Sequence, residues 1–155
     1  MQTESKVAVR TAEIMDYRGV FGWPVRPHNG GPVLVTGAGV GAVAIPKALS
    51  EQVLEGLERH GCSGPALSVP TRQGTIVILL VETDSPAIDE ETLPPGVRVL
   101  TAGTAIPLPA GNLPENLRRW IVAPDTSRRW LPGLAAVLTS IRSACRVQLP
   151  VPWHL

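Results

Sequence analysis

Two copies of the triplet Arg-Arg-Trp are the most distinctive chemical feature of this sequence. They lie ten residues apart around the turn sequence APDTS, and their members are Arg118, Arg119, Trp120, Arg128, Arg129 and Trp130. Guanidinium groups contact phosphates and indole rings stack on bases, so the pattern suits a surface that binds nucleic acid, single-stranded DNA included. The alternative, which we favour, is that both tryptophans anchor a hairpin in the core while the arginines stay solvated.

A glycine pattern near the middle of the chain imitates a nucleotide-binding loop. Residues 37–42 satisfy the spacing G-x-G-x-x-A, which binds a pyrophosphate when a helix N-terminus follows directly. Here a strand-like run that ends in Pro46 follows instead, so we predict a hairpin turn. A small nucleotide-binding protein or enzyme that uses the turn from Gly37 to Gly41 together with Glu82 and Asp84 is the alternative.

Candidate groups for catalysis and metal binding are otherwise isolated. Glu82 and Asp84 resemble the carboxylate pair that holds metal ions in phosphoryl transfer, but they lead into an acidic, Pro-rich run typical of a solvated loop. Cys62 and Cys145 fit two free thiols. We therefore predict no catalytic residue, no metal and no cofactor.

Short apolar runs punctuated by glycine and proline predict many strands and few helices. We predict helices over 3–18, from Pro46 to a stop at Gly61, and over 133–144. We predict extended segments over 21–25, 33–36, 42–45, 65–69, 75–82, 97–101, 104–108 and 119–122, with loops over 27–32 and 83–96. The run 76–81 is apolar throughout, so its strand should be central and buried on both faces. This order of elements argues for an α+β fold, a mostly antiparallel sheet with two to three covering helices.

The chain is long enough for one domain with a hydrophobic core. It has 155 residues, of which 44% are hydrophobic, and we predict a single domain over 1–155 with a core over about 19–146 and an extended tail over 147–155. No apolar run approaches the roughly 18 residues of a membrane span, and the N-terminus lacks a signal-peptide pattern. We therefore expect a cytoplasmic protein without a membrane partner.

Charge is unevenly distributed along the chain. Residues 1–96 carry 7 basic and 11 acidic groups, whereas residues 97–155 carry 7 basic and 2 acidic groups. The C-terminal part is therefore a basic region that can attract an acidic partner.

The order of several phrases resembles a known family. The phrases are YRGVFGWPVRP, CSGPALSVPTRQGTIVILL, VRVLTAGTAIPLPAGN and RRWIVAPDTSRRWLPG, with a Gly-rich strand segment after the first. Over about residues 17–143 this order is similar to the N-terminal domain of actinobacterial bifunctional DNA primase/polymerases, of the archaeo-eukaryotic primase-polymerase type. The resemblance implies a primase-polymerase-like fold.

The same resemblance implies that catalytic residues are missing. Active members carry two acidic residues on one strand and a histidine on a neighbouring strand, whereas this chain has Ile76 where the histidine is expected and no Asp-x-Asp before its second helix. We therefore expect a non-catalytic, shortened relative that binds a protein or a nucleic acid through the two Arg-Arg-Trp triplets. Self-association through the tail PVPWHL is a further alternative.

Overall fold

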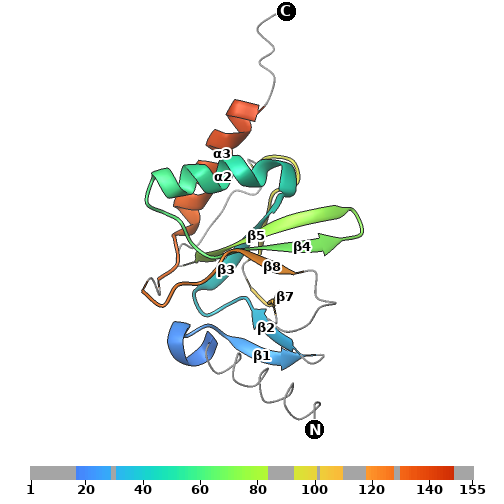
Figure 1. Cartoon of the computed structure of the whole chain (residues 1–155), viewed down its shortest axis with the longest axis vertical. Coiled ribbons are helices and arrows are strands. Elements are labelled where there is room, and N and C mark those ends of the chain that lie inside the picture. The colour runs from blue at the N-terminus through green and yellow to red at the C-terminus, as the bar shows by residue number, and fades with distance from the viewer. Residues whose placement is uncertain are drawn as a thin grey trace, which may run out of the picture.

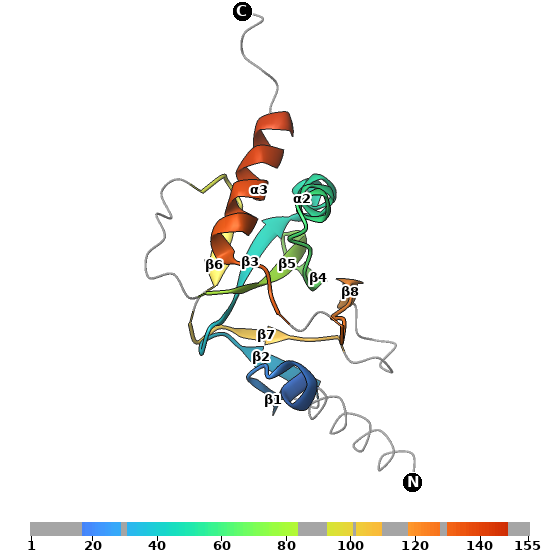
Figure 2. The same cartoon turned by 90° about the vertical axis from the view of Figure 1, so that its left-hand side faces the viewer.

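Three layers of secondary structure make up the fold. The computed structural model describes residues 17–28, 31–83, 93–100, 102–109, 118–127 and 130–148. Within these residues, two helices cover one face of a five-stranded antiparallel sheet, and a three-stranded antiparallel sheet packs against the other face (Figure 1, Figure 2). The predicted α+β class is confirmed, but the strands form two sheets where one was expected.

The larger sheet has the strand order β6-β3-β5-β4-β8, and the smaller sheet has the order β1-β2-β7. The larger sheet comprises β3 (Val40–Pro46), β4 (Ala66–Thr71), β5 (Gly74–Glu82), β6 (Arg98–Leu100) and β8 (Arg119–Val122). The smaller sheet comprises β1 (Val25–His28), β2 (Gly31–Val35) and β7 (Ala105–Pro107). The helices are α2 (Lys47–Arg59) and α3 (Leu134–Gln148), and a helical turn over 17–21 precedes β1.

Strand β5 lies at the centre of the larger sheet and is buried on both faces, as its apolar run predicts. Val77, Leu79 and Val81 point toward α2 and α3 and belong to the helix-side core. Ile78 and Leu80 point the opposite way and belong to the sheet-side core, between the two sheets. Because side chains alternate along a strand, one continuous apolar segment supplies both cores.

The smaller sheet closes the sheet-side core with a row of three paired residues. Val25 pairs with Leu34, and Leu34 pairs with Ile106, so one side chain from each strand stands on the same face. All three are at most 1% exposed. This row is the part of the smaller sheet that the larger sheet covers.

Helix α2 follows its predicted bounds closely. Its apolar positions Leu49, Val53 and Leu57 recur at four-residue spacing and are buried against the sheet. The helix ends where Gly61 adopts a φ of +69°, and the N–H of Cys62 then donates to the carbonyl of Leu57 at 2.8 Å. Glycine is favoured there because a left-handed residue without a Cβ closes a helix C-terminus at little cost.

Strands β2 and β3 do not form the predicted hairpin. The turn between them is tight, with reciprocal hydrogen bonds between Gly37 and Val40 of 2.8 and 3.0 Å, but β2 pairs with β1 and β7 while β3 pairs with β5 and β6. The turn therefore carries the chain from one sheet to the other. Residues of β3 are buried on both faces, because the helices cover one face of the larger sheet and the smaller sheet covers the other.

The predicted loop over 27–32 contains the β1–β2 hairpin instead. Pro27 pairs with Pro32, a pairing that needs no N–H group because alternate residue pairs of an antiparallel ladder are not hydrogen-bonded. The predicted extended segment over 21–25 is wrong at Phe21, which lies in the helical turn.

The remaining strand predictions are confirmed, and α3 extends to Gln148, beyond the predicted end at residue 144. Most of the predicted first helix, the acidic run 84–92 and the tail from residue 149 lie outside the described residues. Within the described ranges, no helix is both long and apolar enough to cross a membrane.

Truncation of a large side chain on either face of β5 should destabilise the protein. Leu79→Ala opens a cavity in the helix-side core and Leu80→Ala opens one in the sheet-side core, and each should lower the free energy of unfolding by about 2–5 kcal/mol. Urea denaturation measures both, with Ile121→Ala as the exposed control, whose cost should stay under about 1 kcal/mol. A cost for Leu80→Ala no greater than that of the control would contradict the packing of the smaller sheet on β5.

Candidate binding surface

A bulge in the edge strand β8 decides where its side chains point. Ala66 of β4 pairs with Val122 and Leu67 pairs with Trp120, so Ile121 is the extra residue between two consecutive pairs. A bulge of this kind reverses the alternation of side chains. Trp120 consequently packs against the sheet-side core, Val122 packs against the helix-side core, and Ile121 is 46% exposed.

Trp120 belongs to a cluster of four aromatic side chains at the edge of the sheet-side core. Its ring centroid lies 6.4 Å from that of Trp23 and 6.3 Å from that of Tyr17. The Nε1–H of Trp120 donates to the hydroxyl of Tyr17 at 3.3 Å, and Phe21 and Tyr17 each stack on Trp23. Trp120 therefore packs against the core as predicted, but in the described residues it does so from the edge strand β8, which pairs with β4, and not from a hairpin.

Trp130 has the opposite placement and is 58% exposed, so the prediction that it anchors a hairpin in the core is wrong. Its indole lines a groove of about 100 Å³ whose other walls are Ser63, Gly64, Pro65, Val122, Ala123 and Asp125. Pro132 packs directly on the backbone of Gly64, and this contact requires a glycine because a Cβ at Gly64 would lie 2.4 Å from Cδ of Pro132. The contact at Gly64 holds the segment that follows Trp130 against the residues that precede β4.

Asp125 gives this groove a polar wall of fixed geometry. Its Oδ1 accepts hydrogen bonds from the backbone N–H of Ser127 at 2.9 Å and from the Ser127 hydroxyl at 2.8 Å. These bonds close an Asx-type turn and hold the carboxylate beside the groove.

The arginines predicted for the surface differ in their environments. Arg119 is exposed on β8, two residues before Ile121 in the chain and opposite Ser68 in the ladder. Arg118 is half-buried and has an interaction partner of its own. Arg128 and Arg129 lie outside the described residues. The structure thus places Arg119, Ile121 and Trp130 on or near the β8 edge; we call these residues and the groove walls the Trp130 surface.

The glycine turn and Glu82 lie side by side. Val40 pairs with Glu82, and the N–H of Thr83 donates to the carbonyl of Gly39 at 2.8 Å; Asp84 lies outside the described residues. No helix follows this turn directly, because the seven residues of β3 come before α2. Packing explains the glycine at Gly41, where a Cβ would lie 2.5 Å from Cγ2 of Thr83.

Ile76, which takes the place of the histidine that the family resemblance implies, packs against the sheet-side core. It is half-buried and stands in the sheet between Pro46 and Val69. Among the residues that the structure describes, no group of three His, Cys, Asp or Glu side chains could hold a metal ion.

Sequence reasoning missed the Trp130 groove and a hollow between the two helices. The walls of the Trp130 groove at 63–65 carry no chemical signal of their own, because they meet Trp130 only through tertiary packing. A second hollow lies between α2 and α3, where Gly56 forms part of its lining. A glycine in the interior of an otherwise strong helix is a signal that could have indicated it.

The two tryptophans should differ sharply in their effect on stability. Trp120→Ala removes stacking and the hydrogen bond to Tyr17, and should lower the free energy of unfolding by about 3 kcal/mol. Trp130→Ala should lower it by less than about 1 kcal/mol, because its indole is mostly in solvent. Urea denaturation compares them, and equal costs for the two variants would contradict their different placement.

Burial raises the pKa of the Cys145 thiol, which lies on α3 and packs against the helix-side core. A raised pKa leaves less thiolate at any given pH, and thiolate is the reactive form. In a Cys62→Ala variant, alkylation of Cys145 by iodoacetamide should therefore have its half-maximal pH above that of a free cysteine. A half-maximal pH equal to or below that of free cysteine would show that the thiol is not desolvated.

Comparison of the chain with protein-family models, curated proteins and solved structures gives no match.

Proposed function

We propose that this chain is a non-catalytic, primase-polymerase-like domain that binds single-stranded nucleic acid through the Trp130 surface. The observation that carries the proposal is the indole of Trp130, 58% exposed at the rim of a groove. Trp130 and Ile121 are the two large hydrophobic side chains that are exposed in the described part of the chain. A large aromatic side chain that is exposed at the rim of a groove is typical of an interaction surface.

The chemistry of this surface favours a nucleobase as the group bound. An exposed indole offers a flat face on which any base can stack. The groove of about 100 Å³ is small, which suits a single ring rather than a folded partner.

Basic residues supply contacts for the backbone of such a ligand. Arg119 is exposed on the same edge strand, and Arg128 and Arg129 directly precede Trp130 in the chain. The excess of basic over acidic groups in residues 97–155 supports long-range attraction of a polyanion. The packing of Ile76 against the sheet-side core supports a binding role over nucleotidyl transfer.

Binding of a fluorescently labelled thymidine oligonucleotide, measured by anisotropy at low salt, tests this proposal. Trp130→Ala should weaken binding by about tenfold, since stacking contributes about 1–3 kcal/mol per base. Trp130→Phe, which keeps an aromatic face, should retain part of the affinity. Arg119→Ala should lower the magnitude of the slope of log K against log salt concentration by about one, as for the loss of one phosphate contact.

A matched variant outside the Trp130 surface controls for general effects of charge loss. Arg59→Ala removes an exposed arginine on α2 and should bind the oligonucleotide like the unmodified chain. Absence of oligonucleotide binding at low salt would overturn the proposal and leave a protein partner as the explanation of the surface. Equal affinities of the Trp130→Ala and unmodified chains would also overturn it.

A further inference from the structure

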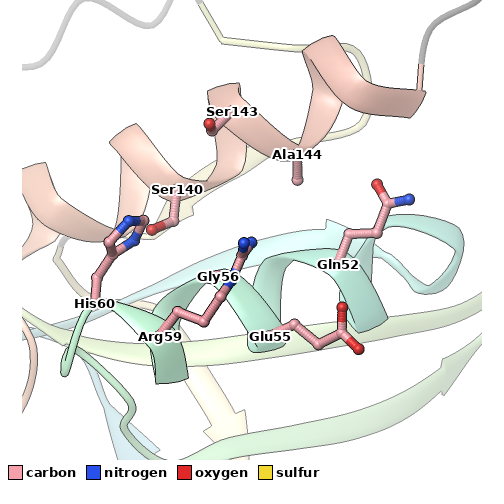
Figure 3. Close-up of a pocket in the computed structure, with 8 residues that line it drawn as sticks. All are labelled: Gln52, Glu55, Gly56, Arg59, His60, Ser140, Ser143 and Ala144. Atoms are coloured by element: carbon pink, nitrogen blue, oxygen red, sulfur yellow. The ribbon is translucent and has the colours of Figure 1, made fainter.

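The outer side of the helix layer carries a second hollow, which the proposed nucleic-acid surface does not include. It lies between α2 and α3, has a volume of about 190 Å³, and is lined by polar and small side chains from both helices (Figure 3). Helix packing normally fills such a space with interlocking side chains. The composition of the facing positions explains why this part of the contact is open.

Small residues face one another across the two helices. Gly56 of α2 is buried, and Ser140 and Ala144 of α3 are each 7% exposed. Apart from the backbone of the helix itself, a Cβ added at Gly56 would have only Nη2 of Arg59 within 4 Å, at 3.9 Å, so the missing side chain leaves open space. The absence of large side chains at these three positions creates the floor of the hollow.

One end of the hollow presents hydrogen-bond donors and positive charge. The guanidinium of Arg59 folds back over Gly56, and the ring of His60 faces Ser140 (Figure 3). Glu55 stands four residues before Arg59, the spacing of a helical ion pair, but its carboxylate points away from the guanidinium (Figure 3). The Arg59 guanidinium is therefore directed to the hollow, where a bidentate anion suits its planar geometry.

The other end presents acceptors. Gln52 and Glu55 line the hollow toward the beginning of α2. In the described part of the chain the Oε1 of Gln52 is buried and has no hydrogen-bond partner. A buried amide oxygen without a donor is unfavourable by about 1–3 kcal/mol, and a rotation of the Gln52 amide toward the hollow would let an N–H group of a ligand satisfy it.

We infer that the hollow between α2 and α3 binds a small zwitterion, with its carboxylate at Arg59 and His60 and its ammonium group at Gln52 and Glu55. Arg59 reaches back to the level of Gly56, four residues from Gln52, and four residues of α-helix span about 6 Å. Between the two ends, Gly56 and Ala144 present no polar side-chain group and leave room for a short methylene chain. A volume of about 190 Å³ is below the range of about 300–1,000 Å³ for drug-sized ligands, which favours a molecule the size of an amino acid.

Titration with 6-aminohexanoate, followed by the amide NMR signals of Gly56, Ser140 and Ala144, tests this inference. Hexanoate lacks the ammonium group and hexylamine lacks the carboxylate, so these two probes separate the two ends of the site. We expect saturable shifts with 6-aminohexanoate at millimolar concentrations, and binding weaker by about tenfold for either single-charge probe, as for loss of one charge-assisted hydrogen bond. Shifts that are absent, or equal for all three probes, would overturn the inference.

A variant of Arg59 tests the assignment of the carboxylate end of the ligand. Arg59→Gln should weaken 6-aminohexanoate and hexanoate by about tenfold and leave hexylamine unchanged, since it removes only the anion partner. Arg72→Gln, an exposed arginine in the β4–β5 turn, is the matched control and should leave all three unchanged. A loss for hexylamine equal to that for hexanoate in Arg59→Gln would overturn the assignment.

Gly56→Leu fills the hollow and should abolish binding, while Gly56→Ala adds a methyl group in open space and should retain it. Thermal unfolding of both variants establishes that they fold. Unchanged binding by a folded Gly56→Leu variant would place the ligand elsewhere and overturn the inference. Neither result depends on nucleic-acid binding, which the anisotropy experiment tests with different residues.

Discussion

Burial of β5 on both of its faces is the constraint on which the rest of this fold depends. One strand with six consecutive apolar residues must be covered twice, and a chain of 155 residues meets this requirement with a helix pair on one side and a second sheet on the other. Consecutive residues of β5 therefore alternate between the two cores: Ile78 and Leu80 lie in the sheet-side core, and Leu79 lies in the helix-side core. Loss of either cover would expose a row of large apolar side chains to water.

The two proposed binding sites arise where this double cover is incomplete. At the β8 edge, the bulge lets Trp120 pack against the sheet-side core and Val122 pack against the helix-side core. The extra residue, Ile121, points into solvent. Bulges at sheet edges often reorient side chains in this way. Between the helices, Gly56 and Ala144 are too small to fill the layer that they share. Polar and charged groups border both places, which makes them suited to ligands rather than to further packing.

Several elements could be predicted because their signals are local. The four-residue spacing of Leu49, Val53 and Leu57 predicts α2 whatever lies opposite, and the TRQG turn joins β4 to β5 as neighbours in the chain. Pairing between distant segments carries no comparable signal, so the assignment of β2 and β3 to different sheets could not be predicted. The same holds for the site: Trp120 and Trp130 stand in identical triplets, and only their tertiary neighbours separate a packed indole from an exposed one.

The sequence by itself determined the α+β class, the central place of β5, the bounds of α2 and the basic character of the C-terminal part, since each follows from composition or from periodicity within one segment. Only the tertiary structure decided that there are two sheets, that Trp120 joins Tyr17 and Trp23, that Trp130 borders a groove and that Gly56 opens a hollow. These features depend on contacts between residues far apart in the chain, whose free energy is a property of the assembled layers and of no single segment.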